Sequence, residues 1–145
     1  MGNRSTFRAA IEARDLNRAV ASFEENAVLH SPISFKPIEG RAAIGELLGV
    51  LSHVFENFHY TDELESADGT EALIFRARVG DREIEGLDLI RFGEAGLIRD
   101  LTVMVRPRSG MEALMAAAGP RLVAARASKG LRAKLGRWMA TLGQS

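Results

Sequence analysis

The chain of 145 residues contains no cysteine, three histidines, one tryptophan and one tyrosine. Without cysteine it forms no disulfide, carries no thiolate nucleophile and builds no thiolate zinc site. The histidines, His30, His53 and His59, fall in different predicted elements, so a histidine-rich metal site is not expected. We therefore predict neither a metal nor a cofactor.

The chain also lacks a long apolar run. No stretch approaches the roughly 18 apolar residues of a membrane span, and the first residues lack the apolar core of a secretory signal. There is no internal repeat and no low-complexity tract. With 46% hydrophobic and 26% charged residues, the composition is typical of one soluble globular domain. We expect a cytoplasmic protein.

Charge is distributed unevenly, although the formal net charge is zero. Residues 1–120 hold 13 basic and 19 acidic residues, a net charge of −6, whereas residues 121–145 hold six basic residues and no acidic residue, a net charge of +6. Nucleic-acid binding is not expected, because phosphate contacts need a basic surface and most of this chain is acidic.

Hydrophobic spacing predicts helices first and strands afterwards. Helical periodicity covers residues 6–25, with a break near Arg14 and Asp15, and residues 41–55. Between them, residues 27–32 indicate a short strand and residues 33–40 a loop. The period then changes to two over residues 57–66, 70–79, 83–92 and 97–105, which predicts an antiparallel meander and an α+β fold. Two more helical stretches are predicted from residue 109, separated at Gly119 and Pro120.

One strand of this meander carries a carboxylate in an apolar row. Side chains two positions apart share a face, and in "EIEGLDLIRF" this face carries Ile84, Gly86, Asp88, Ile90 and Phe92. Desolvation in such a row raises the pKa of a carboxyl by as much as about 3 to 5 units. In the alternative interpretation Asp88 is ionised and pairs with one of three arginines on neighbouring strands: Arg76, Arg78 or Arg99.

Several stretches resemble the SnoaL-like branch of the nuclear-transport-factor-two-like superfamily. They are "ENAVLHSP", "IEGRAAIGELL" and "GLDLIRFGEAGLIRDLTVMVRP", and the resemblance covers about residues 5–118. We therefore divide the chain into a main domain, residues 1–118, and a C-terminal extension, residues 119–145. The resemblance implies a cone in which a strongly bent antiparallel sheet wraps around the N-terminal helices and a long third helix. It also implies an apolar pocket and, commonly, a homodimer.

Members of this family include steroid isomerases, polyketide cyclases, epoxide hydrolases, dehydratases and pure binding modules, so the fold alone does not name the function. In the ketosteroid isomerase branch, the position matching Asp88 holds an acid that stays protonated and donates a hydrogen bond to an oxyanion. The matching general base falls at Ser31, which is not basic, and the tyrosine of the first helix has no counterpart. The aspartate of the epoxide hydrolases falls at Val103. Neither steroid isomerisation nor epoxide hydrolysis is therefore expected to follow the mechanism known in the family.

The predicted site combines one carboxyl with apolar walls. Asp88 and His30 are the candidate acid–base groups, although His30 can equally be a hydrogen-bonded core histidine. The predicted ligand-binding residues are Ser31, Tyr60, Gly86, Ile90, Leu101, Val103 and Val105. Gly86 would leave room for a ligand beside Asp88. We expect a homodimer that binds a small, mostly apolar molecule. Acid–base chemistry of isomerase, cyclase or dehydratase type is one hypothesis, and a non-catalytic binding or dimerisation module is the other.

The C-terminal extension has the pattern of a basic amphipathic helix. Its apolar side carries Leu131, Leu135, Trp138, Met139 and Leu142. Such a helix can pack on the acidic main domain or on a dimer partner, which is the arrangement we expect. Contact with an anionic membrane and disorder are the alternatives.

Overall fold

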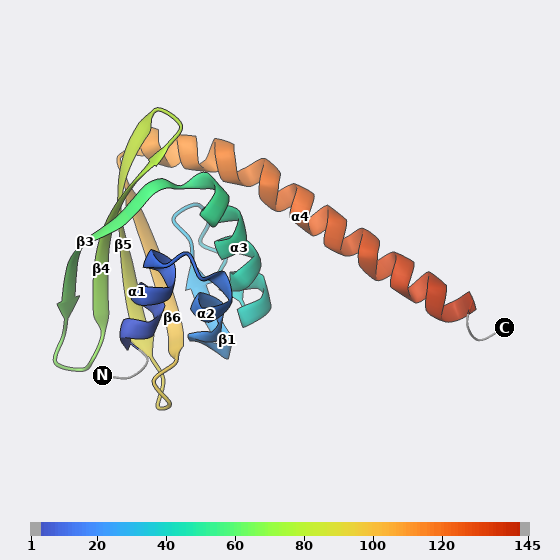
Figure 1. The fold of residues 1–145 in the computed structure, drawn as a ribbon, viewed down its shortest axis with the longest axis horizontal. Coiled ribbons are helices and arrows are strands. Elements are labelled where there is room, and N and C mark those ends of the chain that lie inside the picture. The colour runs from blue at the N-terminus through green and yellow to red at the C-terminus, as the bar shows by residue number, and fades with distance from the viewer. Residues whose placement is uncertain (1–3, 143–145) are drawn as a thin grey trace.

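The computed structural model describes residues 4–142, which form four helices and six strands (Figure 1). The helices are α1 (Arg4–Glu12), α2 (Leu16–Ala21), α3 (Arg41–Val54) and α4 (Arg108–Leu142). The strands are β1 (Phe23–His30), β2 (Ile38–Glu39), β3 (Glu56–Glu65), β4 (Glu71–Val79), β5 (Arg82–Phe92) and β6 (Ile98–Arg106). The α+β prediction is confirmed. The ends of the predicted domains, residues 1 and 145, lie outside the described residues.

The two N-terminal helices are separated where the sequence predicted a break. Arg14 adopts a left-handed conformation with φ 58°, which ends the first helical segment. Asp15 then caps α2, because its Oδ1 accepts a hydrogen bond from the backbone nitrogen of Arg18 at 3.1 Å. Phe7 on α1 and Ala19 on α2 are buried, so both helices pack on the core.

The strands form one sheet in the order β2-β1-β6-β5-β4-β3. Strands β3 to β6 form the predicted antiparallel meander. However, β1 runs parallel to β6, because the chain between them contains α3 and the rest of the meander, and no tight turn sets their relative direction. The sequence also missed β2, which lies in the predicted loop and pairs with β1.

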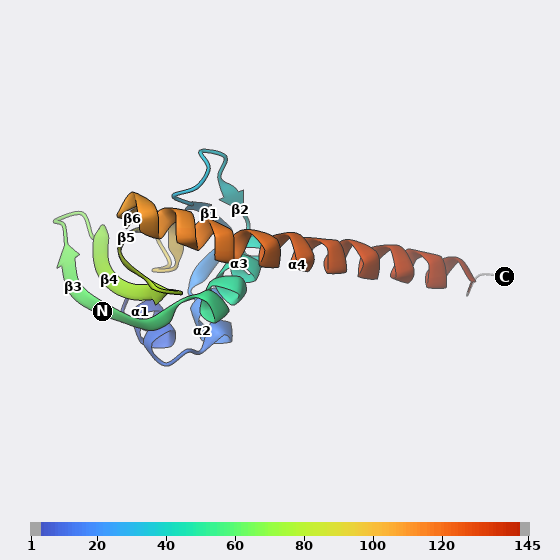
Figure 2. The same ribbon diagram turned by 90° about the horizontal axis from the view of Figure 1, so that it is seen from above.

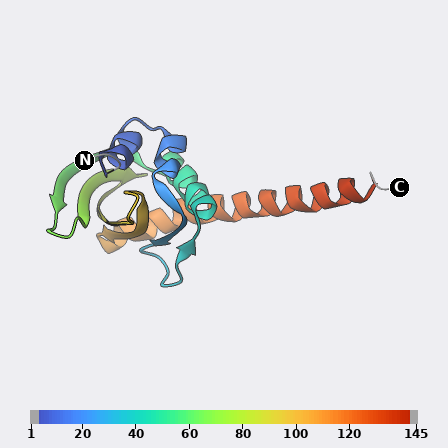
Figure 3. The ribbon, with the colours of Figure 1, turned by 90° about the horizontal axis from the view of Figure 1, so that it is seen from below.

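The sheet curls around α1, α2 and α3, which lie on its concave side (Figures 2 and 3). Helix α3 buries one side, with Ile44, Leu47, Val50 and Val54 at intervals of three or four residues. These side chains pack in two buried clusters with residues of the concave face. The fold is therefore a curled sheet whose hollow side is filled by helices.

Helix α4 is continuous over Arg108–Leu142, so the predicted separation into two helical stretches at Gly119 and Pro120 is wrong. Pro120 has no N–H to donate to the carbonyl of Ala116, but both residues are exposed and water can reach that carbonyl. Alanine, leucine, lysine and arginine on both sides of the proline favour helix. The local cost of proline is therefore outweighed by the helix around it.

The two parts of α4 have different surroundings. The first part packs on the main domain through Gly110, Leu114 and Ala118, which are buried. Residues 126–142 are all exposed, and this part projects away from the rest of the molecule (Figures 1 and 2). Within residues 4–142, no helix is long and apolar enough to cross a membrane.

Candidate functional site

A cavity of about 460 Å³ lies between the concave face of the sheet and the helices. Small-molecule sites in proteins span roughly 300 to 1,000 Å³, so the cavity has the size of a ligand site. Much of its wall is apolar and includes Phe7, Leu29, Leu47, Leu51, Leu101, Val103, Val105, Leu114 and Leu122. The wall therefore combines residues of α1, α3, α4 and the sheet.

Asp88 lies in the middle of β5 and faces this cavity. Its neighbours across the sheet are Leu73 on β4 and Val103 on β6, so no charged side chain flanks it in its row. The residue is only 7% exposed. Burial raises the pKa of Asp88 from 3.8 to about 7, and a hydrogen bond from Tyr60 opposes this rise only in part. Near neutral pH the protonated and ionised forms of Asp88 are therefore both populated.

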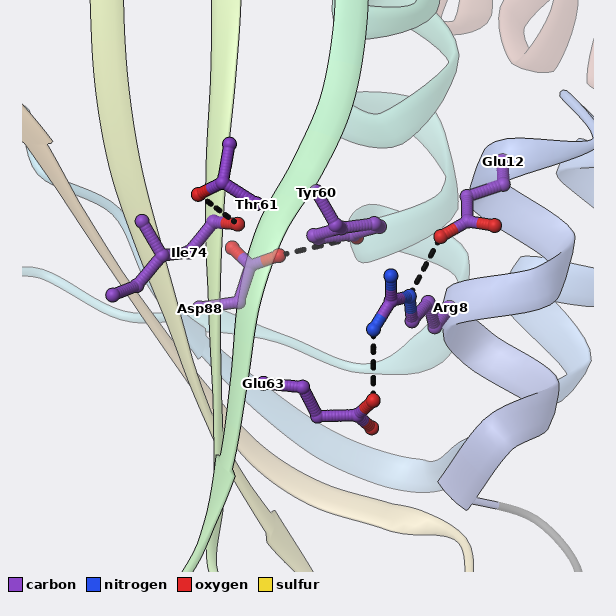
Figure 4. A network of polar contacts seen from close by, with 7 residues as sticks. All are labelled: Arg8, Glu12, Tyr60, Thr61, Glu63, Ile74 and Asp88. Carbon is purple, nitrogen blue, oxygen red and sulfur yellow. Dashed lines mark hydrogen bonds and ion pairs between the residues drawn. The ribbon is translucent and has the colours of Figure 1, made fainter.

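Tyr60 on β3 is the only tyrosine of the chain and donates a hydrogen bond to Asp88. Its Oη lies 3.4 Å from Oδ2 of Asp88 (Figure 4), which is long for such a bond and makes it weak. Burial, followed by the negative charge of Asp88, raises the pKa of Tyr60. The phenol therefore stays protonated and acts as a donor.

Arg8 connects Tyr60 to the N-terminal helix. Its guanidinium carbon lies 5.4 Å from the centre of the Tyr60 ring. The same guanidinium pairs with Glu12 at 2.6 Å and with Glu63 at 2.7 Å (Figure 4). The hydrogen bond to Glu12 is the main cause of a raised pKa of Arg8. These contacts link α1 to β3 and hold the Tyr60 ring in place.

The arginines considered as ion-pair partners of Asp88 lie elsewhere. They pair with other carboxylates: Arg76 with Glu85 at 3.4 Å, Arg78 with Glu83 at 3.6 Å, and Arg99 with Glu24 at 3.4 Å. Arg76 and Arg78 alternate along β4 with the buried Phe75 and Ala77, and so lie on the convex face. The interpretation of Asp88 as half of a surface ion pair is therefore wrong.

Most of the predicted ligand-binding residues lie on the cavity wall. These are Ser31, Tyr60, Leu101, Val103 and Val105, and they share the wall with Asp88. Three predicted site residues, His30, Gly86 and Ile90, are not among the described residues that line the cavity. Their positions have separate physical explanations.

His30 lies on the convex face of the sheet. Leu29 faces the core, and the next residue of a strand must face the other way. Nε2 of His30 lies 3.0 Å from Oδ2 of Asp100, and 40% of the His30 side chain is exposed. His30 is therefore neither a partner of Asp88 across the cavity nor a core histidine.

Gly86 and Ile90 shape the wall without lining it. A Cβ atom on Gly86 would lie 2.1 Å from Cζ of Phe75, so the missing side chain makes room for that ring and not for a ligand. Phe75 itself lines the cavity. Ile90 is 1% exposed and belongs to the core. Both residues support the residues that do face the cavity.

Two parts of the wall were missed from the sequence. The first is an aromatic cluster around Phe58. Its ring stacks on that of Phe75, with 4.7 Å between the ring centres, and meets that of Tyr60 edge to face, with 5.1 Å between the ring centres. The second is a polar side with Glu12, Arg14, Asp15, Ser52, His53 and Asn57. Alternation of Phe58 and Tyr60 along β3 signals the cluster, but the polar residues come together only in the folded chain. In the part that the structure describes, no group of three or more His, Asp or Glu residues is placed to hold a metal ion.

Comparison with known proteins places the chain in a family. It belongs to the SnoaL-like domain family, whose model matches residues 5–101. It is similar to a steroid delta-isomerase from Pseudomonas aeruginosa, with 40% identity and a TM-score of 0.80 over 88% of this chain and 96% of that chain. The predicted resemblance and the cystatin-like, nuclear-transport-factor-two-like fold are confirmed.

Two further structures share this fold. An uncharacterised bacterial protein with a cystatin-like fold from Silicibacter pomeroyi DSS-3 has 28% identity and a TM-score of 0.77, over 83% of this chain and 84% of that chain. The epoxide hydrolase/cyclase-like enzyme SalBIII, which acts in pyran ring formation in the polyether salinomycin, has 19% identity and a TM-score of 0.62. That match covers 74% of this chain and 90% of that chain. A comparison with curated protein sequences gives no match.

Proposed function

We propose that this chain binds a small, mostly apolar molecule in its cavity and that protonated Asp88 acts on a carbonyl-type oxygen of that molecule. The observation that carries the proposal is a carboxyl that is buried in a largely apolar cavity wall, where burial raises its pKa to about 7. A group whose pKa lies near the ambient pH is suited to proton transfer. The chemistry is cofactor-independent isomerisation, cyclisation or dehydration.

The geometry around Asp88 gives each oxygen a role. Tyr60 donates to Oδ2, so in the neutral acid the hydroxyl hydrogen belongs on Oδ1. Oδ1 is then the donor to the ligand oxygen. Asp88 is 7% exposed and its neighbours are apolar, so it is poorly hydrated, which strengthens such a hydrogen bond as negative charge develops on the ligand oxygen. Tyr60 is a positioning residue that keeps the acid oriented.

The relative from Pseudomonas aeruginosa supports a steroid-like ligand. That protein is a steroid delta-isomerase at 40% identity, and the match spans 96% of its length. A rigid polycyclic molecule with one carbonyl oxygen fits the combination of apolar walls and a single buried acid. We infer a ligand of this class for the present chain.

A second candidate function is ligand binding without turnover. Ser31 stands on the cavity wall where the family resemblance places the general base, and serine is not basic at neutral pH. Its Oγ accepts hydrogen bonds from the backbone nitrogens of Ile33 and Ser34, both at 3.3 Å. Ser31 therefore stabilises the loop after β1 and does not supply a base. This observation favours a protein that binds its ligand without converting it, called here a carrier.

Binding and turnover of an unsaturated steroid ketone separate the two candidates. Binding is measured by calorimetry, and isomerisation is followed by the absorbance of the conjugated enone. We expect wild type to bind, with turnover that follows an apparent pKa of about 7 if the chain is an enzyme. Asp88→Asn removes this dependence, whereas Asp100→Asn, the same change on the convex face, leaves it intact. Binding without turnover in wild type supports the carrier, and failure to bind any apolar ketone contradicts both candidates.

Adding the missing base sharpens this test. Ser31→Asp places a carboxylate on the cavity wall, and Ser31→Asn is the matched uncharged control. If only the base separates a carrier from an isomerase, Ser31→Asp gains enone formation and Ser31→Asn does not. Equal rates in the two variants would show that position 31 does not supply a base.

A further inference from the structure

The polar side of the cavity forms its mouth. Its residues are Glu12, Arg14, Asp15, Ser52, His53 and Asn57. All six are exposed, whereas Asp88, on the same cavity wall, is 7% exposed. Asn57 lies three positions before Tyr60 on β3, so the mouth is about 10 Å along this strand from the residue that contacts Asp88. A long ligand that reaches Asp88 therefore has its other end at the mouth.

Arg14 occupies a backbone position that ordinarily holds glycine. It follows α1, where its own N–H donates to the carbonyl of Ile11 at 3.1 Å and the N–H of Asp15 donates to that of Ala10 at 2.8 Å. This is the Schellman pattern of a helix end, in which the residue at the position of Arg14 is left-handed and usually glycine. Arg14 adopts φ 58° although its Cβ atom makes this conformation unfavourable. The chain thus accepts a local cost to place an arginine at the mouth.

A second residue with this unusual conformation lies at the same place. Within residues 4–142, the only other non-glycine residue with a positive φ is Asn57, at 54°. Arg14 and Asn57 come from different elements, and both line the mouth. Backbone strain of this kind concentrates at functional sites, where a particular side chain is needed in a particular place. The mouth is therefore a candidate binding site in its own right.

The carboxylates of the mouth are engaged, whereas the guanidinium of Arg14 has donors to spare. Glu12 pairs with Arg8 at 2.6 Å (Figure 4), and Asp15 caps α2. Arg14 donates from Nη2 to the backbone oxygen of Ser52 at 3.1 Å, and within residues 4–142 it forms no ion pair with a carboxylate. A guanidinium carries five N–H donors in a planar fork that fits a carboxylate through two hydrogen bonds. The mouth therefore suits an anionic acceptor.

We propose that Arg14 binds a carboxylate at the outer end of the ligand while Asp88 binds the carbonyl-type oxygen at its inner end. This assignment, which rests on the proposed function, narrows the ligand class to an apolar keto acid. At the exposed mouth the carboxylate keeps part of its hydration, so binding there avoids the cost of burying a charge. Beside Asp88 the same carboxylate would be desolvated and repelled. Arg14 therefore also sets the direction in which the ligand enters, with the ketone first.

Two ligands that differ only at the outer end test this assignment. One is an androstene ketone with a carboxylate on the ring farthest from the ketone, and the other is its methyl ester. Calorimetry with the wild-type chain should give a dissociation constant at least about tenfold lower for the acid than for the ester, because only the acid forms a charge-assisted pair with Arg14. Added salt should reduce this preference, since the pair is exposed.

Substitutions of Arg14 separate binding from a purely structural role of its contact with Ser52. Arg14→Gln should reduce the preference for the acid to within about twofold, whereas Arg18→Gln, the same loss of charge on an exposed residue outside the cavity wall, should keep it. Arg14→Gly should lose the preference too, yet unfold at a urea concentration no lower than wild type, because glycine adopts φ 58° without strain. A structural arginine would instead lower stability and leave the preference intact when replaced.

The failures of this assignment and of the proposed function are distinct. Equal binding of acid and ester to wild type would overturn the role of Arg14 and leave that of Asp88 standing. A preference for the acid that survives in Arg14→Gln would assign the carboxylate to another group. Asp88→Asn should weaken both ligands by the same factor, so their ratio stays that of wild type. Absence of binding by either ligand would overturn the proposed function and this assignment together.

Discussion

The main domain and the projecting part of α4 place their apolar residues in opposite ways. In the main domain the sheet and helices enclose Leu73, Ile90 and Leu101, and Asp88 is buried with them. In the projecting part the apolar side chains lie at the surface among basic residues. Burial makes Asp88 an acid that titrates near neutral pH, whereas the apolar side chains of the tail stay in contact with solvent. One chain thus combines a buried acid with an exposed apolar side chain cluster on a projecting helix.

The largest expected effect is the response of stability to pH when Asp88 is removed. The pKa of Asp88 is about 7 in the folded chain, whereas the ordinary value of 3.8 applies to the unfolded chain. The folded state therefore holds the proton more tightly. The pH-dependent cost of Asp88 is therefore absent below about pH 4, grows as the pH rises to about 7, and reaches about 4 kcal/mol above that. Asp88→Asn should be more stable than wild type by up to this amount at high pH.

Urea unfolding of both proteins over this pH range measures the effect. The difference between them should grow as pH rises and be smallest at acid pH. Asp100→Asn, on the convex face, serves as the control and should not show this growth. Parallel stability curves for wild type and Asp88→Asn would show that the folded chain does not perturb this carboxyl.

Glycine-to-alanine substitution in the main domain gives the next largest effect. A Cβ atom on Gly86 meets the ring of Phe75 at 2.1 Å, so Gly86→Ala forces the aromatic cluster to move. We expect a loss of about 1 to 3 kcal/mol in the free energy of unfolding. The midpoint of denaturant unfolding measures it, and a neutral result would mean that Phe75 has free space beside it.

The same substitution in the tail should have the opposite sign. Apart from the adjacent residues and the backbone of its own helix, no atom lies within 4 Å of the Cβ position of Gly136, and the residue is exposed. Gly136→Ala should stabilise that helix locally by about 0.5 to 1 kcal/mol. Amide hydrogen exchange around residue 136 should slow. Faster exchange would indicate that the glycine is needed for a close contact.

The smallest effect concerns the hydrogen bond between Tyr60 and Asp88. This bond lowers the pKa of Asp88 against the larger influence of burial. Tyr60→Phe should therefore raise the pKa of Asp88 further, seen by infrared spectroscopy as a protonated carboxyl that persists to higher pH. A lower pKa in the variant would mean that water enters the cavity and solvates the carboxylate.

Much of the fold was predictable because its signals are local. Alternating hydrophobicity and turn residues marked the strands of the meander, and helical spacing marked α1 to α3. The parallel pairing of β1 with β6 was not predictable, because residues far apart in the sequence decide it. Pro120 was misinterpreted because its cost depends on whether the unpaired carbonyl can reach water, which only the folded structure shows.

The site was predictable only in part. Asp88 stood out because an acid interrupts an apolar row. His30 was assigned to the site although its neighbour Leu29 already occupied the inward position of that strand. Gly86 was predicted to leave room for a ligand, because the sequence does not show that the ring of Phe75, on another strand, fills that space. The polar side of the cavity, with Arg14 and His53, depends on contacts between helices that no periodicity describes.

The most direct test of this account is a carbon NMR titration of the Asp88 carboxyl, assigned by comparison with Asp88→Asn. Burial in the cavity wall predicts a midpoint of about pH 7, and a bound apolar ketone that accepts its hydrogen bond should move the midpoint upward. A midpoint near the ordinary 3.8, unchanged by such ligands, would contradict a protonated acid in the cavity.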